Sequence, residues 1–129
     1  MKKLPFILIV SLAAAITVIA QHGGKAEPNR ITFAPGHSST TLSATLGADE
    51  EMEYVFSARG GQTVTITNPS TSLFDVRIFS EENNVETEFD SSRTFSLKLP
   101  ADGDYNLFVR KKRVKTPQRA RFSITLSIR

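Results

Sequence analysis

Apolar and polar residues alternate with a period of two through most of the chain from position 29 onward, in short runs bounded by Gly, Pro, Asn and Ser. Successive side chains of a β-strand point to opposite faces, so the alternation indicates strands with one buried and one solvated face. The spacing of an amphipathic helix does not occur after position 20. The pattern therefore predicts an all-β fold, an antiparallel β-sandwich of the jelly-roll or Greek-key type with about eight strands.

The apolar positions of these runs mark the expected strands and core. The 129 residues suffice for one domain, which we place at residues 29–129. Nine Phe and two Tyr supply most of the large side chains, because the chain has no Trp. Run by run, the alternating residues are Ile31 and Phe33; Leu42, Ala44 and Leu46; Tyr54, Phe56 and Ala58; Val64 and Ile66; Val76 and Ile78; Phe95, Leu97 and Leu99; Tyr105, Leu107 and Val109; and Phe122, Ile124, Leu126 and Ile128.

The first 20 residues have the pattern of a secretory signal peptide. Lys2 and Lys3 precede an apolar run, 6–20, that is shorter than the roughly 20 apolar residues of a membrane-spanning helix. We expect cleavage after Ala20, with cleavage after Ala26 as the alternative, and a flexible tail at 21–28. No membrane span is expected after cleavage. An exported chain without cysteine indicates the periplasm of a Gram-negative bacterium.

Charge is segregated along the chain. Twelve of the thirteen acidic residues lie between Asp49 and Asp104, whereas the segment after Asp104 holds eight basic residues and no acidic one. Seven of the eight fall in RKKRVKTPQRAR, at 110–121, where Pro117 predicts a loop. Export and the lack of aromatic residues in this run argue against nucleic acid as a partner. Anionic lipid, lipopolysaccharide or a carboxylate-rich protein surface remain alternatives.

Catalytic and metal-binding chemistry has little support in these residues. The absence of cysteine removes thiol nucleophiles and thiolate zinc sites. His37 stands beside Ser38 and Ser39, but the preceding Gly36 favours a turn. The run 102–104, Asp-Gly-Asp, is typical of a hairpin turn and has no calcium loop around it. We therefore expect no enzyme activity, no metal and no cofactor.

Three segments together resemble a known family. They are FAPGHSS at 33–39, YVFSARGGQ at 54–62 and LPADGDY at 99–105, followed by the basic run and a terminal strand. In this order they resemble the periplasmic lysozyme inhibitors of Gram-negative bacteria, and most closely the g-type lysozyme inhibitors. The resemblance implies a β-sandwich that inserts loops into the peptidoglycan-binding cleft of a lysozyme. There it would contact the catalytic carboxylates and protect the cell wall from host lysozyme.

The resemblance also implies a set of lysozyme-binding residues. Gly103 and Tyr105 match the family's Ser-Gly-x-Tyr motif, with Asp102 in place of the serine. Arg113 and Arg119 match arginines on the loop that follows. Where the g-type inhibitors carry a tyrosine in the turn between the second and third strands, this chain has Asp49. The expected partner is g-type lysozyme, with i-type lysozyme as a second candidate.

Alternatives remain open at this point. Tyr105 also begins an apolar alternation, so it could be a core residue, and Arg113 could be an ordinary residue of a solvated loop. The turns at 60–62 and 99–105 also resemble pre-peptidase C-terminal domains, which would favour a secreted module that binds carbohydrate or anionic envelope components. Exposed edge strands leave a homodimer open as well.

Overall fold

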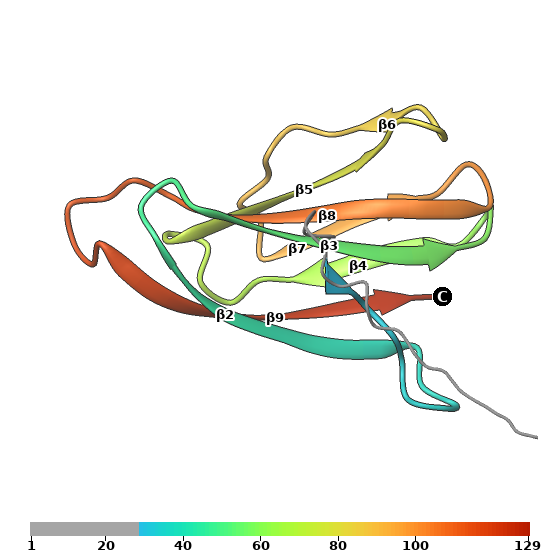
Figure 1. Ribbon diagram of the computed structural model, residues 1–129, viewed down its shortest axis with the longest axis horizontal. Coiled ribbons are helices and arrows are strands. Elements are labelled where there is room, and N and C mark those ends of the chain that lie inside the picture. Colours follow the sequence, from blue (N-terminus) through green and yellow to red (C-terminus); the bar gives the residue numbers. More distant parts are fainter. Residues whose placement is uncertain (1–28) are drawn as a thin grey trace, which may run out of the picture.

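The computed structural model describes residues 29–129, which form nine strands in two sheets packed face to face (Figure 1). The predicted signal peptide, the predicted tail at 21–28 and the cleavage positions Ala20 and Ala26 lie outside these residues. No helix occurs in the described part. Accordingly, a search of it for a helix long and apolar enough to cross a membrane finds none. The predicted all-β sandwich is confirmed.

Five strands form the first sheet, in the order β1-β3-β8-β5-β6. All neighbours in this sheet are antiparallel except β1 and β3, which are parallel. The bounds are β1 Asn29–Arg30, β3 Glu51–Ala58, β5 Phe74–Ser80, β6 Val85–Glu86 and β8 Gly103–Lys111. Because β8 pairs with β3 on one side and β5 on the other, it is the central strand of this sheet.

The second sheet is fully antiparallel and has four strands, in the order β2-β9-β4-β7. Their bounds are β2 Ser39–Gly47, β4 Thr63–Thr67, β7 Thr94–Lys98 and β9 Arg119–Ile128. The strand β9 lies between β2 and β4, so strands far apart in sequence become neighbours (Figure 1).

The core lies between the two sheets and consists of inward residues that the alternation marked, together with Phe74, which it did not mark. Phe56 on β3 stacks on Tyr105 of β8, with ring centroids 5.7 Å apart. Phe74 meets Phe122 of the other sheet edge to face, at 5.6 Å. The fully buried members of the core are Phe56, Val64, Ile66, Phe74, Val76, Ile78, Leu99, Tyr105, Leu107, Val109, Phe122, Ile124 and Leu126.

Three details differ from the expectation. The first strand is Asn29–Arg30, although Ile31 is still buried and its N–H donates to Val55 O at 2.8 Å. The two-residue β6 was missed, because so short a strand has no alternation to detect. The predicted loop at 110–121 shrinks to 112–118, since β8 runs on to Lys111 and β9 begins at Arg119.

Candidate functional site

The predicted lysozyme-binding residues lie at two opposite ends of the sandwich. Asp102 lies in the turn before β8, Gly103 is the first residue of that strand, and Tyr105 lies near its start. Asp49 lies in the turn between β2 and β3, and Arg113 follows the far end of β8 (Figure 1). Since β8 has nine residues, these groups are separated by roughly 25 Å of extended strand. The structure therefore does not bring the six residues into one site.

Tyr105 is part of the core. Its side chain is fully buried, and its hydroxyl donates to Ala101 O at 2.5 Å and accepts from Ala101 N at 3.3 Å. A tyrosine hydroxyl that bonds to the backbone a few residues upstream holds a turn against the sheet, as in the tyrosine corner of other β-sandwiches. This is the core alternative that the sequence left open, and it puts the ring out of reach of a partner surface.

Asp102 and Gly103 also have local structural roles. The Asp102 carboxylate accepts from the N–H of Gly60 at 2.8 Å and so joins the turn before β8 to the turn after β3. Gly103 has φ 143°, and a Cβ there would lie 2.6 Å from Oε2 of Glu82. This backbone conformation favours glycine, whereas the nearby Glu82 and Asn83 atoms are the ends of flexible side chains that can shift.

At the other end, Asp49 and Arg113 form an exposed ion pair. The guanidinium donates through Nε to Asp49 Oδ2 at 2.9 Å and through Nη2 to the same oxygen. The Arg113 side chain is 73% exposed and that of Asp49 54%. Backbone bonds fix the turn, because Asp49 N–H donates to Lys111 O at 2.9 Å and Lys111 N–H donates to Glu50 O at 3.0 Å. Two predicted site residues that are 64 positions apart in sequence are thus in direct contact.

Arg119 lies next to this pair. Its Nη1 is 3.9 Å from Oε1 of Glu50, and the same Glu50 oxygen accepts from the N–H of Gly47 at 2.6 Å. The Glu50 carboxylate is therefore held mainly by the turn, and the arginine, 65% exposed, is only weakly paired. We call the surface formed by Asp49, Lys112, Arg113, Lys115 and Arg119 the basic end.

Lys112 of the basic end and its neighbour Lys111 make hydrogen bonds that tie this surface to the sandwich. Lys111 continues the inward series of β8 and is fully buried, with Nζ donating to Lys112 O at 2.8 Å. Lys112 is half-buried, donating through Nζ to Thr71 O at 2.9 Å and through its N–H to Leu73 O at 2.8 Å. The start of the 112–118 loop is thereby anchored, whereas Arg113 and Lys115 stay exposed.

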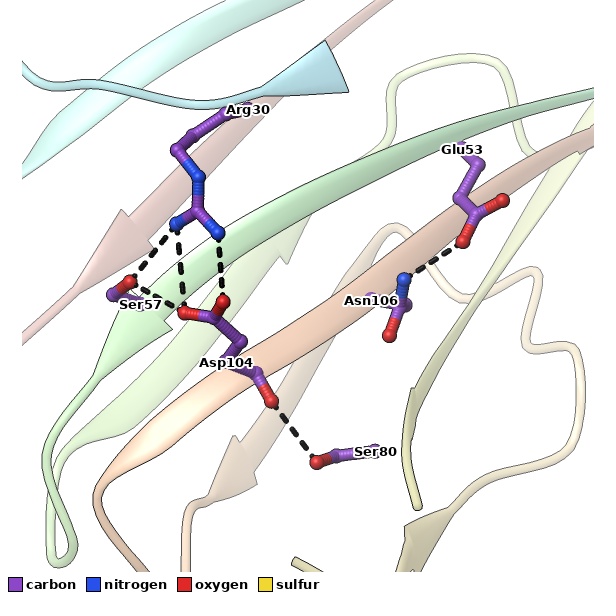
Figure 2. A network of polar contacts seen from close by, with 6 residues as sticks. All are labelled: Arg30, Glu53, Ser57, Ser80, Asp104 and Asn106. Carbon is purple, nitrogen blue, oxygen red and sulfur yellow. Dashed lines mark hydrogen bonds and ion pairs between the residues drawn. The ribbon is translucent and has the colours of Figure 1, made fainter. Parts of the chain in front are cut away.

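A polar network joins β1, β3 and β8 near the other end of the sheet, as Figure 2 shows. Asp104 accepts from Arg30 Nη2 at 2.6 Å and from Ser57 Oγ at 2.6 Å. The hydrogen bonds from Arg30 and then Ser57 lower the pKa of Asp104 from its ordinary value. Nearby, Asn106 donates to Glu53 at 2.7 Å. Arg30 thereby adds contacts with Ser57 and Asp104 to the backbone pairing of β1 with β3.

The outer face of the same sheet carries arginines and phenylalanines that the sequence analysis did not single out. The Arg77 guanidinium lies 5.1 Å from the ring centroid of Phe108, and Arg110 lies 3.8 Å from that of Phe89. Arg110 also donates to both oxygens of the buried Asp75, at 3.0 and 2.7 Å, which raises the pKa of Arg110. The available signal was that the outward positions of β5 and β8 include Arg77, Phe79, Phe108 and Arg110, which are aromatic or basic where neutral polar residues are usual.

Next to this face, Phe79 borders a shallow hollow that is otherwise polar. Its remaining lining residues are Ser80, Glu81, Glu82, Asp104 and Asn106. Within residues 29–129, no three His, Asp or Glu side chains are grouped so that they could hold a metal ion. The carboxylates of 102–104 are instead engaged with Gly60, Arg30 and Ser57.

Comparison with solved structures shows a shared fold. PliG of Aeromonas hydrophila, a periplasmic lysozyme inhibitor of g-type lysozyme, matches with a TM-score of 0.64 and 23% identity over 79% of this chain and 96% of its own. PliG of Salmonella Typhimurium, also a periplasmic lysozyme inhibitor of g-type lysozyme, matches with a TM-score of 0.64 and 23% identity, over 81% of this chain and 100% of its own. A mutant of the Escherichia coli PliG matches with a TM-score of 0.63 and 24% identity, over 81% of this chain and 100% of its own.

Sequence comparison with family models and with curated proteins finds no match. The expected likeness to the g-type lysozyme inhibitors is confirmed at the level of the fold, which these three proteins share with the chain over most of its length.

Proposed function

We propose that this protein is a periplasmic inhibitor of lysozyme, with g-type lysozyme as the favoured target and i-type lysozyme as the second. The fold shared with three periplasmic inhibitors of g-type lysozyme supports the proposal. The protein acts by occupying the peptidoglycan-binding cleft and needs no catalytic residue, metal or cofactor of its own. Its role in the cell is to protect the wall from host lysozyme.

The basic end is the surface that enters the cleft. The observation that carries this assignment is the exposed Arg113 guanidinium, which Asp49 holds through Nε and Nη2. Nη1 makes no hydrogen bond within the described residues, so a second carboxylate has a donor to bind. Glycosidase clefts contain a catalytic pair of carboxylates, and a guanidinium is well suited to carboxylate binding.

Arg119 supplies a second cation beside Arg113, and Lys115 a third. Arg119 is the more easily redirected arginine, because its distance of 3.9 Å to Glu50 is longer than a hydrogen bond. Asp102, Gly103 and Tyr105 belong to the opposite end, where their contacts are within the chain, so we leave them out of the contact surface.

Lysis of peptidoglycan-bearing cells by g-type, i-type and c-type lysozymes, with and without the protein, tests the proposal. We expect R113E to weaken inhibition at least tenfold, as for a central interface arginine. R59E is the matched control, because Arg59 is exposed in the turn between β3 and β4 at the other end. Equal potency of R113E and the unaltered protein would remove the basic end from the mechanism. Failure of a folded sample to inhibit any of the three lysozymes would contradict the function itself.

One observation favours a second function, that of a secreted module that binds carbohydrate. Phe79, which is half-buried and has the Arg77 guanidinium 5.4 Å from its ring centroid, borders the hollow beside the carboxylates and the amide, a combination suited to sugar hydroxyls and to contact with a pyranose ring. Co-sedimentation with insoluble peptidoglycan tests this function. Binding that is lost in F79A, with R113E unaffected, would support it over inhibition.

A further inference from the structure

The two sheets have four edge strands among the described residues, and one of them differs from the other three. β1 and β6 have two residues each, and β7 has five and ends in Lys98. β2 has nine residues, STTLSATLG, with no charge and no proline. Natural proteins protect edge strands by shortness, charge, proline or a bulge. The edge of β2 is not protected by shortness, charge or proline, so among these four edges it is the one best suited to pair with an added strand.

The register shows which backbone groups of β2 face outward. In an antiparallel ladder, residue pairs that exchange hydrogen bonds alternate with pairs that do not. Ile128 N–H donates to Ser38 O at 2.9 Å, so the even-numbered residues of β2 direct their N–H and C=O toward β9. The odd-numbered residues direct theirs toward the open edge.

One of these odd-numbered residues is already satisfied. Gly47 donates its N–H to Glu50 Oε1 at 2.6 Å, and its carbonyl accepts from Glu50 N–H at 3.0 Å. The backbone groups of Ser39, Thr41, Ser43 and Thr45 have no such partner within residues 29–129. The open edge thus presents four donors and four acceptors in a regular row.

We propose that this edge pairs with β2 of a second copy of the chain, antiparallel and with Leu42 on the twofold axis. In this register Ser39 pairs with the second copy's Thr45 and Thr41 with its Ser43. All eight outward groups of each copy then find a partner, because every outward position meets an outward position. The two four-stranded sheets become one continuous sheet of eight strands.

A second copy fits this edge better than a charged partner does. The strand has no charge that would repel its own copy. On the inner face the register sets Leu42 against the second copy's Leu42, and Ala44 against its Thr40. Leu42 and Ala44 are only half-buried in the single chain, so pairing would cover the remaining exposed part of both side chains. The absence of charge on β2 and the burial of Leu42 and Ala44 thus both favour pairing with a second copy.

Sedimentation equilibrium tests the proposal with protein expressed from the full 129-residue coding sequence. We expect a concentration-dependent dimer. The double variant T41K/S43K places like charges directly opposite each other and should weaken the dimer at least tenfold. The control S123K/T125K adds the same two charges to β9, at the positions paired with Ser43 and Thr41, and should leave it unchanged. A monomer at every concentration up to about 1 mM, or equal dimers from both double variants, would overturn the proposal.

The register has a separate test, because the chain has no cysteine of its own. In the proposed dimer the two copies of Leu42 form a pair of opposite residues that exchange no backbone hydrogen bonds. Their Cα atoms lie about 4.5 Å apart, a distance that a disulfide can span. L42C should therefore form a covalent dimer on oxidation, whereas S123C should not. A dimer that L42C fails to cross-link would overturn this register and interface. Lysozyme inhibition is measured separately, so failure here does not affect the proposed function.

Discussion

Replacing Tyr105 with Phe separates a structural role of its hydroxyl from a role in partner binding. The ring is fully buried and stacks on Phe56, and Phe preserves that contact. What is lost is the bond donated to Ala101 O at 2.5 Å and the weaker bond accepted from Ala101 N at 3.3 Å. One hydrogen bond contributes about 0.5–1.5 kcal/mol net. Ala101 is half-buried, so water replaces part of the loss.

We therefore expect Y105F to lower the free energy of unfolding by about 1–2 kcal/mol. For a domain of this size, that corresponds to a fall in Tm of about 5–10 °C. Tyr54, the other tyrosine, is also buried, but its hydroxyl makes no hydrogen bond within the described residues. Y54F is therefore the matched control and should change the free energy of unfolding by under about 0.5 kcal/mol.

Urea unfolding followed by circular dichroism measures the stability of the three proteins, and lysozyme inhibition is then measured at equal concentrations of folded protein. We expect Y105F to inhibit as well as the unaltered protein. The reasoning would be refuted by a Y105F protein with an unchanged urea midpoint and weakened inhibition, because the hydroxyl would then act on the partner.

Three further changes test other parts of the structure. G103A should destabilise the protein by about 1–3 kcal/mol in thermal unfolding, because its φ of 143° is a backbone conformation that residues with a Cβ rarely adopt. R110A should lower the free energy of unfolding by about 2 kcal/mol, after allowance for the partial exposure of the arginine, because it leaves the buried Asp75 carboxylate unpaired. R113A, which removes an exposed ion pair, should lower it by under about 0.5 kcal/mol. Equal losses of the two variants in urea unfolding would contradict this. Asp104 has a lowered pKa when folded, so stability should fall as the pH drops from its ordinary 3.8 through the folded value, and an acid titration of D104N should show a smaller fall.

The sequence predicted most of the strands because their alternation is strong, and the structure shows where the pattern was insufficient. Lys111 continues the inward series after Val109, but its charge made it resemble a loop residue. The alternation marks the inward face of a strand without marking its neighbours, so it could not show which strands share a sheet or that β9 lies between β2 and β4. Both properties depend on pairings between distant residues, which no local pattern records.

The sequence indicated less about the contacts of the candidate site residues than about the fold, for a related reason. The segment 99–105 was correctly identified as a turn, but the bond from the Tyr105 hydroxyl to Ala101 depends on three-dimensional geometry. Asp49 was notable only as the position where a tyrosine was absent. Its contact with Arg113 joins positions 64 apart, and the sequence alone held no sign of it.

The place of β9 in its sheet has a consequence for how the chain folds. β9 is the only neighbour of β2 within that sheet, and the paired residues Ser39 and Ser127 are almost ninety positions apart. During synthesis β4 and β7 can already pair, whereas β2 must wait for β9 before its ladder can form. Closing so long a loop is entropically costly, and folding dominated by such contacts is slow.

Until β9 is available, β2 is exposed along both of its edges. A strand without charge or proline is then a site where nascent chains can associate before they fold. The interval between the synthesis of β2 and the synthesis of β9 is therefore the stage at which chains are most prone to associate with one another. Binding of a chaperone to β2 in this interval would raise the yield of folded protein most.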